Sequence, residues 1–151
     1  MALPDDDATR RLGARLAEVL VPGDVVLLSG DLGAGKTTLV RGLAEALGVD
    51  AKAVTSPTFA LLQWHPTAAP RLDGAALLHA DLYRIDSDQG LQALGLLDDL
   101  GADDVVACIE WPERLRPWLT DFAVYDLALR KSGEGRQATL TGPRVSELTD
   151  G

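Results

Sequence analysis

The segment from Gly30 to Thr37 constrains this chain more than any other part of its sequence. It reads GDLGAGKT and fits the pattern Gly-x-x-x-x-Gly-Lys-Ser/Thr of phosphate-binding loops. The apolar, β-branched run 25–29 before it predicts a buried strand, and residues 37–47 after it have the periodicity of a helix. The sequence therefore predicts a strand, a phosphate-binding loop and a helix in direct succession.

Each fixed position of the motif has a residue type that phosphate binding requires. Gly30 and Gly35 permit backbone angles that a Cβ would forbid, so successive amide groups can turn toward one anion. The helix that begins near Lys36 directs its positive dipole end at the same anion. We expect Lys36 to reach the β- and γ-phosphates, the Thr37 hydroxyl to bind Mg²⁺, and Thr38 to add a weaker phosphate contact. ATP or ADP with Mg²⁺ is the predicted ligand.

The glycines of this segment allow two other interpretations. A dinucleotide-binding loop has the spacing Gly-x-Gly-x-x-Gly, which Gly30, Gly33 and Gly35 do not fit. A purely structural turn needs no lysine and hydroxyl at the start of the next helix. The nucleotide-phosphate loop is the favoured interpretation.

The length and composition suit a single domain. The chain has 151 residues, of which 46% are hydrophobic, enough for one core and too few for a second domain. Lys and Arg total 14 against 23 Asp and Glu, so the formal net charge is -9. Such a surface repels a phosphate backbone, and we expect no direct binding of nucleic acid by this chain alone.

No part of the sequence predicts a membrane span or export. No apolar run approaches the roughly 18 residues needed to cross a bilayer, and residues 1–7 are acidic where a signal peptide would be basic. Cys108 is the single cysteine, so it cannot form an internal disulfide and is expected in the core. We expect a cytoplasmic protein.

Residues outside the loop predict further elements. Residues 5–7 offer N-caps for an amphipathic helix that ends before Pro22. Residues 122–129 and 137–140 alternate in hydrophobicity and predict a hairpin that extends the sheet antiparallel. Residues 65–74 are expected to form an exposed connection.

These elements predict an α/β fold. We expect a single P-loop NTPase domain, residues 1–151, with a mixed parallel and antiparallel sheet flanked by helices. The ends, about residues 1–5 and 143–151, are expected to fray.

The stretch Thr55-Ser56-Pro57-Thr58 allows two interpretations. Its residue types are those of a simple turn before a strand at 59–63. They also suit a switch loop in which Thr58 senses the γ-phosphate and Mg²⁺. The sequence favours neither.

Two predicted strands, 75–81 and 105–110, end in a carboxylate as the metal-binding strand of P-loop proteins does. The second is apolar throughout and follows a helical crossover at 87–100, so we place it beside the strand of the phosphate loop. Glu110 is therefore the predicted Mg²⁺ ligand, directly or through water, and Asp81 is expected to orient water or substrate. The alternative is that each acid is only a solvated strand end.

Three further side chains lie close to these motifs in sequence. Trp111 follows the predicted metal ligand and is either a core aromatic or a lid near the nucleotide. His79 precedes Asp81 and is expected to be structural. Arg136 is more simply a surface strand residue than a nucleotide contact.

Five blocks in this order resemble the TsaE family of small bacterial P-loop ATPases, and the similarity extends from about residue 3 to residue 141. The blocks are Leu3-Pro4-Asp5 with Ala8-Thr9, residues 30–38, Ser56-Pro57-Thr58-Phe59, His79-Ala80-Asp81-Leu82-Tyr83-Arg84 and Ile109-Glu110-Trp111-Pro112-Glu113. The family is needed to make threonylcarbamoyladenosine beside the anticodon of tRNAs that read ANN codons, and the resemblance implies that the chain does not itself transfer the threonylcarbamoyl group.

The resemblance implies an ATPase that binds the threonylcarbamoyltransferase subunit and its non-catalytic paralogue and resets that complex between turnovers. It implies only an indirect role for tRNA. Thr37 and Glu110 correspond to the family's Mg²⁺ ligands, and Asp81 to a residue needed for activity. Asp6 and Arg136 correspond to positions near the nucleotide base. The residues that correspond to the family's phosphate loop are Leu32, Gly33, Ala34, Gly35, Lys36 and Thr37.

From the residues alone, the favoured mechanism is phosphoryl transfer to water, with Lys36, Asp81 and Glu110 as its catalytic side chains. No arginine of the sequence is placed as a finger, and Arg84 is only the nearest candidate. We expect a partner protein to supply or position the missing group, so hydrolysis by the isolated chain is expected to be slow. A small-molecule kinase is one alternative, and a non-hydrolysing module that uses ATP to hold its shape is another.

Overall fold

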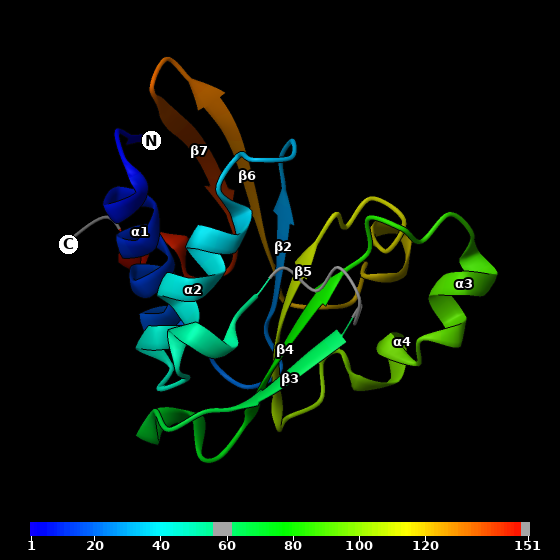
Figure 1. Cartoon of the computed structure of the whole chain (residues 1–151). Coiled ribbons are helices and arrows are strands. Elements are labelled where there is room, and N and C mark those ends of the chain that lie inside the picture. The colour runs from blue at the N-terminus through cyan, green and yellow to red at the C-terminus, as the bar shows by residue number, and fades with distance from the viewer. Residues whose placement is uncertain (56–61, 149–151) are drawn as a thin grey trace.

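Strand β2 (Val25–Ser29) lies at the centre of a mixed sheet and delivers the glycine-rich loop at its carboxyl end (Figure 1). The computed structural model describes residues 1–55 and 62–148. In these ranges one α/β domain has a seven-stranded sheet of order β1-β7-β6-β2-β5-β4-β3. The other strands are β1 Ala2–Leu3, β3 Leu62–Pro66, β4 Ala76–Asp81, β5 Val105–Glu110, β6 Val124–Ser132 and β7 Gly135–Thr141.

The centre of the sheet is parallel and its edges are antiparallel. β2 runs parallel to β5 and β6, and β4 runs parallel to β5. Val25 to Leu28 are all buried, as expected for a parallel strand covered on both faces. The mixed sheet is confirmed, but β6 does not join it antiparallel as the sequence analysis predicted. β6 is parallel to β2, and β7 alone reverses direction beside it.

Helices cover both faces of the sheet, α1 and α2 on one and α3 and α4 on the other (Figure 1). Their bounds are α1 Asp6–Val19, α2 Lys36–Ala46, α3 Asp88–Ala93 and α4 Leu96–Asp99, and short 3₁₀ turns lie at Ala51–Ala53, Pro70–Leu72, Arg116–Trp118 and Val145–Leu148. The crossover expected at 87–100 is two helices, because Gly95 between them has φ 69°. No helix in the described ranges is long and apolar enough to cross a membrane.

The backbones of helices α1 and α2 pack directly against each other at two glycines. The Asp5 side chain caps α1 by accepting from the Ala8 amide, as the acidic run predicted. A Cβ on Gly42 would lie 2.1 Å from the Arg10 carbonyl oxygen, and one on Gly13 would lie 2.2 Å from the Leu39 oxygen. This close contact anchors α2, and with it the loop that precedes α2, on the rest of the domain.

Both chain ends are ordered where the structure describes them, so the prediction of frayed residues 1–5 and 143–148 is wrong there. β1 pairs with β7, and Leu3 is only 4% exposed. Arg144 binds the Asp24 carboxylate and the Val19 carbonyl, and Leu148 is buried. Long-range pairing orders these ends, which local sequence does not indicate.

The segment around β3 differs in part from its prediction. The strand continues through Pro66, and His65 is buried, so the connection to β4 is shorter than the expected 65–74. The first part of the expected strand and the Ser56 to Thr58 loop lie outside the described residues.

Candidate functional site

The loop between β2 and α2 leaves its backbone amides open to a ligand. Gly35 is the N-cap of α2, with φ 101° and no capping side chain. A Cβ on Gly35 would lie 2.6 Å from Arg136 Nε, and one on Gly30 would lie 2.5 Å from the Leu129 carbonyl oxygen. Only glycine fits either position. The first-turn amides of α2 therefore form an anion site without competition from a capping side chain.

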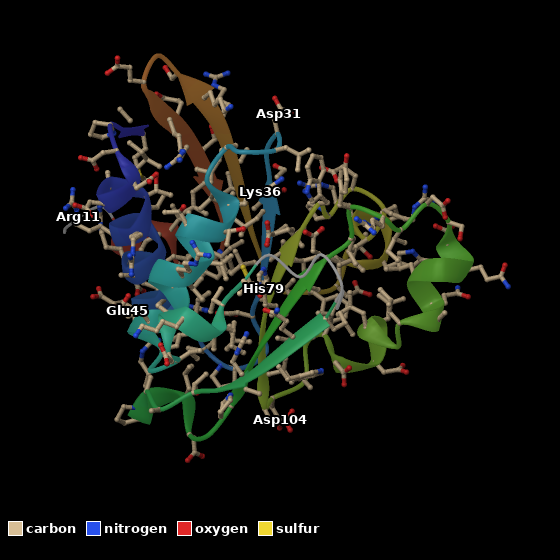
Figure 2. The ribbon with its side chains drawn as sticks, in the orientation of Figure 1. Arg11, Asp31, Lys36, Glu45, His79 and Asp104 are labelled. Atoms are coloured by element: carbon tan, nitrogen blue, oxygen red, sulfur yellow. The ribbon has the colours of Figure 1, made fainter. Side chains whose placement is uncertain are left out.

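The predicted acids meet at the carboxyl ends of neighbouring parallel strands. Asp81 on β4 is paired in register with Glu110 on β5, and both are buried. Together with Lys36 and Thr37 they line a cavity of 330 Å³. Its remaining lining residues are Leu32, Gly33, Gly35, Thr38, Trp111 and Arg136. The structure thus brings together the predicted catalytic and metal-binding side chains. Lys36, one of them, lies at the end of the sheet opposite Asp104 (Figure 2).

The Lys36 ammonium group interacts electrostatically with both carboxylates. Burial lowers the pKa of Lys36, and the charges of Glu110 and Asp81 oppose that shift. Burial also raises the pKa of Asp81, although the Tyr83 amide donates to its Oδ1 at 2.9 Å and favours the charged form. The site is therefore a buried ion cluster that an entering phosphate and metal ion would rearrange.

Lys36 lies over the ring of Trp111. Lys36 Nζ donates to the Gly30 carbonyl and lies 3.6 Å from the centroid of the Trp111 ring. Trp111 has φ 56°, which is uncommon for a bulky residue and costs about 1 kcal/mol or more. Its ring also contacts Tyr83, with centroids 4.8 Å apart. Trp111 is thus a half-buried wall of the site.

His79 is bonded to the predicted metal ligand. Its Nε2 lies 2.5 Å from Glu110 Oε2, and both side chains are buried. The other ring nitrogen, Nδ1, has no partner in the described part of the chain. His79 thereby fixes one oxygen of Glu110 and leaves the other for the cavity.

The donor set suits a hard cation. Thr37, Asp81 and Glu110 offer oxygen ligands, which Mg²⁺ prefers. Within the described residues, no group of three or more His, Cys, Asp or Glu side chains forms a metal cage. Mg²⁺ is commonly held by one or two carboxylates together with phosphate oxygens and water, and the residues present fit that arrangement.

Arg136 links Asp6 and Thr9 of α1 to the phosphate loop. Its Nη1 donates to Asp6 Oδ1 at 2.7 Å and to Thr9 Oγ1 at 3.0 Å, while its guanidinium packs on Gly35. Arg136 lines the cavity directly, whereas Asp6 reaches it through Arg136. Arg136 is therefore more than the surface strand residue that its own pattern suggested.

The family model described as "Threonylcarbamoyl adenosine biosynthesis protein TsaE" matches residues 3–138. The chain belongs to the TsaE family. A Streptomyces coelicolor TsaE is 46% identical over 142 residues, which are 88% of this chain and 89% of that protein. A Nostoc TsaE is 36% identical, over 92% of this chain and 83% of that protein.

Comparison with a solved structure supports the α/β fold. The crystal structure of Bacillus subtilis YdiB is similar with a TM-score of 0.68 and 28% identity, covering 91% of this chain and 80% of that one. The TsaE match confirms the family resemblance stated from the sequence, and the YdiB match confirms the α/β fold.

The remaining predicted residues differ in their relation to this TsaE site. Arg84 is exposed and does not line the cavity. Leu32 is 65% exposed at the cavity mouth. Thr58, the proposed γ-phosphate sensor, lies outside the described residues.

Sequence reasoning missed one contact of the site. It expected His79 to be structural, and the available signal was its position two residues before Asp81, which places both side chains on one face of the strand.

Proposed function

We propose that this TsaE-family chain is a Mg²⁺-dependent ATPase that acts in the threonylcarbamoyladenosine modification of tRNA. The observation that carries this proposal is the convergence of Lys36, Thr37, Asp81 and Glu110 on one cavity at the end of the phosphate loop. Family membership supports the pathway, because the relatives are named tRNA threonylcarbamoyladenosine biosynthesis proteins.

The chain's own residues supply binding and electrostatic stabilisation. Loop amides hold the phosphate oxygens, and Lys36 leaves the Trp111 ring to place its charge at the β- and γ-phosphates. Thr37 and Glu110 would hold Mg²⁺, which supplies positive charge where phosphate oxygens become more negative. Asp81, whose pKa is raised by burial, positions the attacking water or the water ligands of Mg²⁺.

Hydrolysis by the isolated chain is proposed to be slow. The exposed Arg84 does not line the cavity, so a partner is needed to supply or position the missing stabilising group. We propose that the partner is the complex of the threonylcarbamoyltransferase subunit and its non-catalytic paralogue, in the cytoplasm. The net charge of -9 favours contact with tRNA only through that complex.

The test is phosphate release from Mg-ATP by the chain alone and after addition of the cognate transferase and paralogue. Strong stimulation that is lost in Glu110→Ala supports the proposal. Glu18→Ala is the matched control, because Glu18 is exposed on α1 and its loss should leave stimulation intact.

Other outcomes identify the rival functions. Unchanged or absent hydrolysis with both partners present overturns the proposed role. Transfer of phosphate to an added small molecule would instead indicate a kinase, and ATP binding without phosphate release would indicate a non-hydrolysing module.

A further inference from the structure

The hairpin of β6 and β7 lies against every glycine of the phosphate loop. A Cβ on Gly30 would meet the Leu129 oxygen at 2.5 Å, and one on Gly35 would meet Arg136 Nε at 2.6 Å. At Gly33 the nearest atom is Lys131 Nζ, 3.5 Å from the position of the Cβ. The hairpin therefore borders the loop on one side of β2, while β5 and β4, which end in Glu110 and Asp81, lie on the other side (Figure 1).

The strand pattern explains why Lys131 faces the loop. Successive side chains of a strand alternate between faces, so Leu127, Leu129 and Lys131 lie on one face of β6. Leu127 and Leu129 are buried in the core under α1 and α2. Lys131 extends this face beyond the core to the loop, while its neighbour Arg130 lies on the opposite face and is exposed.

The charges on this face are unbalanced. Lys131 and Arg136 are directly opposite each other in the hairpin register, and like charges at such positions repel. Arg136 has the Asp6 carboxylate at 2.7 Å. Lys131 has no ion pair with any described residue. An anion bound at the loop would relieve the repulsion and supply the missing partner for Lys131.

We propose that Lys131 is a second lysine of the nucleotide site, which binds the phosphate groups from the hairpin side while Lys36 binds them from the helix side. This inference rests on the proposed function, because it requires a nucleotide in the loop. It adds a phosphate contact from Lys131 to the β6–β7 hairpin, whose Arg136 already lines the cavity. The contribution is electrostatic, so it falls as salt screens the charges.

The test compares the dissociation constant of ADP, measured by calorimetry, for the parent chain, Lys131→Met, Lys131→Arg and Arg130→Met. At about 0.02 M salt, Lys131→Met should weaken ADP binding about tenfold, which equals about 1.4 kcal/mol. Lys131→Arg should restore most of the affinity. Arg130→Met, which removes the adjacent charge from the other face, should change it less than about twofold.

The same measurement at about 0.5 M salt, where screening is strong, tests the electrostatic origin. The tenfold difference between parent and Lys131→Met should shrink there. A difference that persists at high salt, or equal effects of Lys131→Met and Arg130→Met at low salt, overturns the inference. These results are distinct from failure of the proposed function, which is measured as phosphate release, because the parent chain can bind ADP and still not hydrolyse ATP. Unchanged melting temperatures of the ligand-free variants confirm that the fold is intact.

Discussion

His79 Nε2 and Glu110 Oε2 lie 2.5 Å apart across the β4 and β5 pair, buried beneath the candidate phosphate site. A buried partner of this kind fixes the orientation of a metal-binding carboxylate, and its loss typically weakens metal affinity about 10-fold to 100-fold. We expect His79→Leu to raise the Mg²⁺ concentration for half-maximal phosphate release at least about tenfold. His79→Gln keeps a hydrogen-bond donor, so its Mg²⁺ concentration for half-maximal phosphate release should lie between those of His79→Leu and the parent chain.

Urea unfolding of the same variants separates positioning from stability. His79→Leu leaves the Glu110 carboxylate without its donor and should lower the free energy of unfolding by about 1–3 kcal/mol. A variant that loses stability but keeps the parent's Mg²⁺ dependence would show that His79 only supports the fold.

Contact between Lys36 and Trp111 predicts an optical signal for nucleotide binding. Lys36 Nζ lies 3.6 Å from the indole centroid, so its movement to a phosphate removes a charge from the ring. Trp64 and Trp118 are exposed and are replaced by Phe to isolate Trp111. Saturating ADP should then change the Trp111 fluorescence.

Lys36→Met is the control for that signal. Without the ammonium group, the fluorescence should not respond to ADP, and ADP affinity should fall by more than about tenfold. A parent emission that stays constant at saturating ADP would show that Lys36 remains on the ring in the bound state.

The sequence was sufficient to predict those features whose information is local. The loop from Gly30 to Thr37 and β2 form as predicted because adjacent residues specify them. The meeting of Asp81 and Glu110 was also predictable, since parallel strands end at one edge of the sheet.

Features that depend on register and distant pairing were not predictable in this way. The His79 bond to Glu110 requires knowing which residues of β4 and β5 lie side by side. Lys131 lies beyond the strand predicted at 122–129, because the pattern does not show how far β6 extends. The bond of Arg144 to Asp24 joins residues 120 positions apart, so a tail that looked frayed is held in place.

Close packing of α1 on α2 predicts a stability effect at Gly42. A Cβ there would lie 2.1 Å from the backbone oxygen of Arg10, so the helices must separate to admit it. We expect Gly42→Ala to lower the free energy of unfolding by about 2 kcal/mol, despite the better helix propensity of alanine. Urea titration measures this change.

Gly90→Ala is the matched control, because Gly90 is also helical but is not packed against another backbone. A Cβ on Gly90 would have the Ser87 side-chain hydroxyl as its nearest neighbour, at 3.2 Å. Its effect should stay within about 1 kcal/mol. Equal effects at the two glycines would contradict close packing as the cause.

His65 predicts a pH dependence of stability. Burial lowers the pKa of His65 from its ordinary value of 6.5, and the nearby His79 lowers it further. The unfolded chain then binds more protons than the folded chain between the lowered pKa and 6.5. The stabilising contribution of neutral His65 is therefore present above pH 6.5 and is lost as the pH falls through the folded-state pKa.

The measurement is the free energy of unfolding at about pH 8 and about pH 5 for the parent chain and His65→Phe. Phenylalanine cannot be protonated, so the variant should lose less stability on acidification. The same loss in both proteins would show that other groups cause it.

The bond of Arg144 to Asp24 predicts that the C-terminal segment stabilises the domain. Asp24 is 3% exposed and also accepts from the Val21 amide at 2.8 Å. Arg144→Met leaves this buried carboxylate without its cation and should lower the free energy of unfolding by about 2–3 kcal/mol, less than a fully buried pair because Arg144 is partly exposed. Adding Asp24→Asn removes the unpaired charge, so the double variant should be less destabilised than the sum of the single variants. Urea unfolding of all four proteins measures this coupling, and strictly additive changes would show that the two side chains stabilise the fold independently.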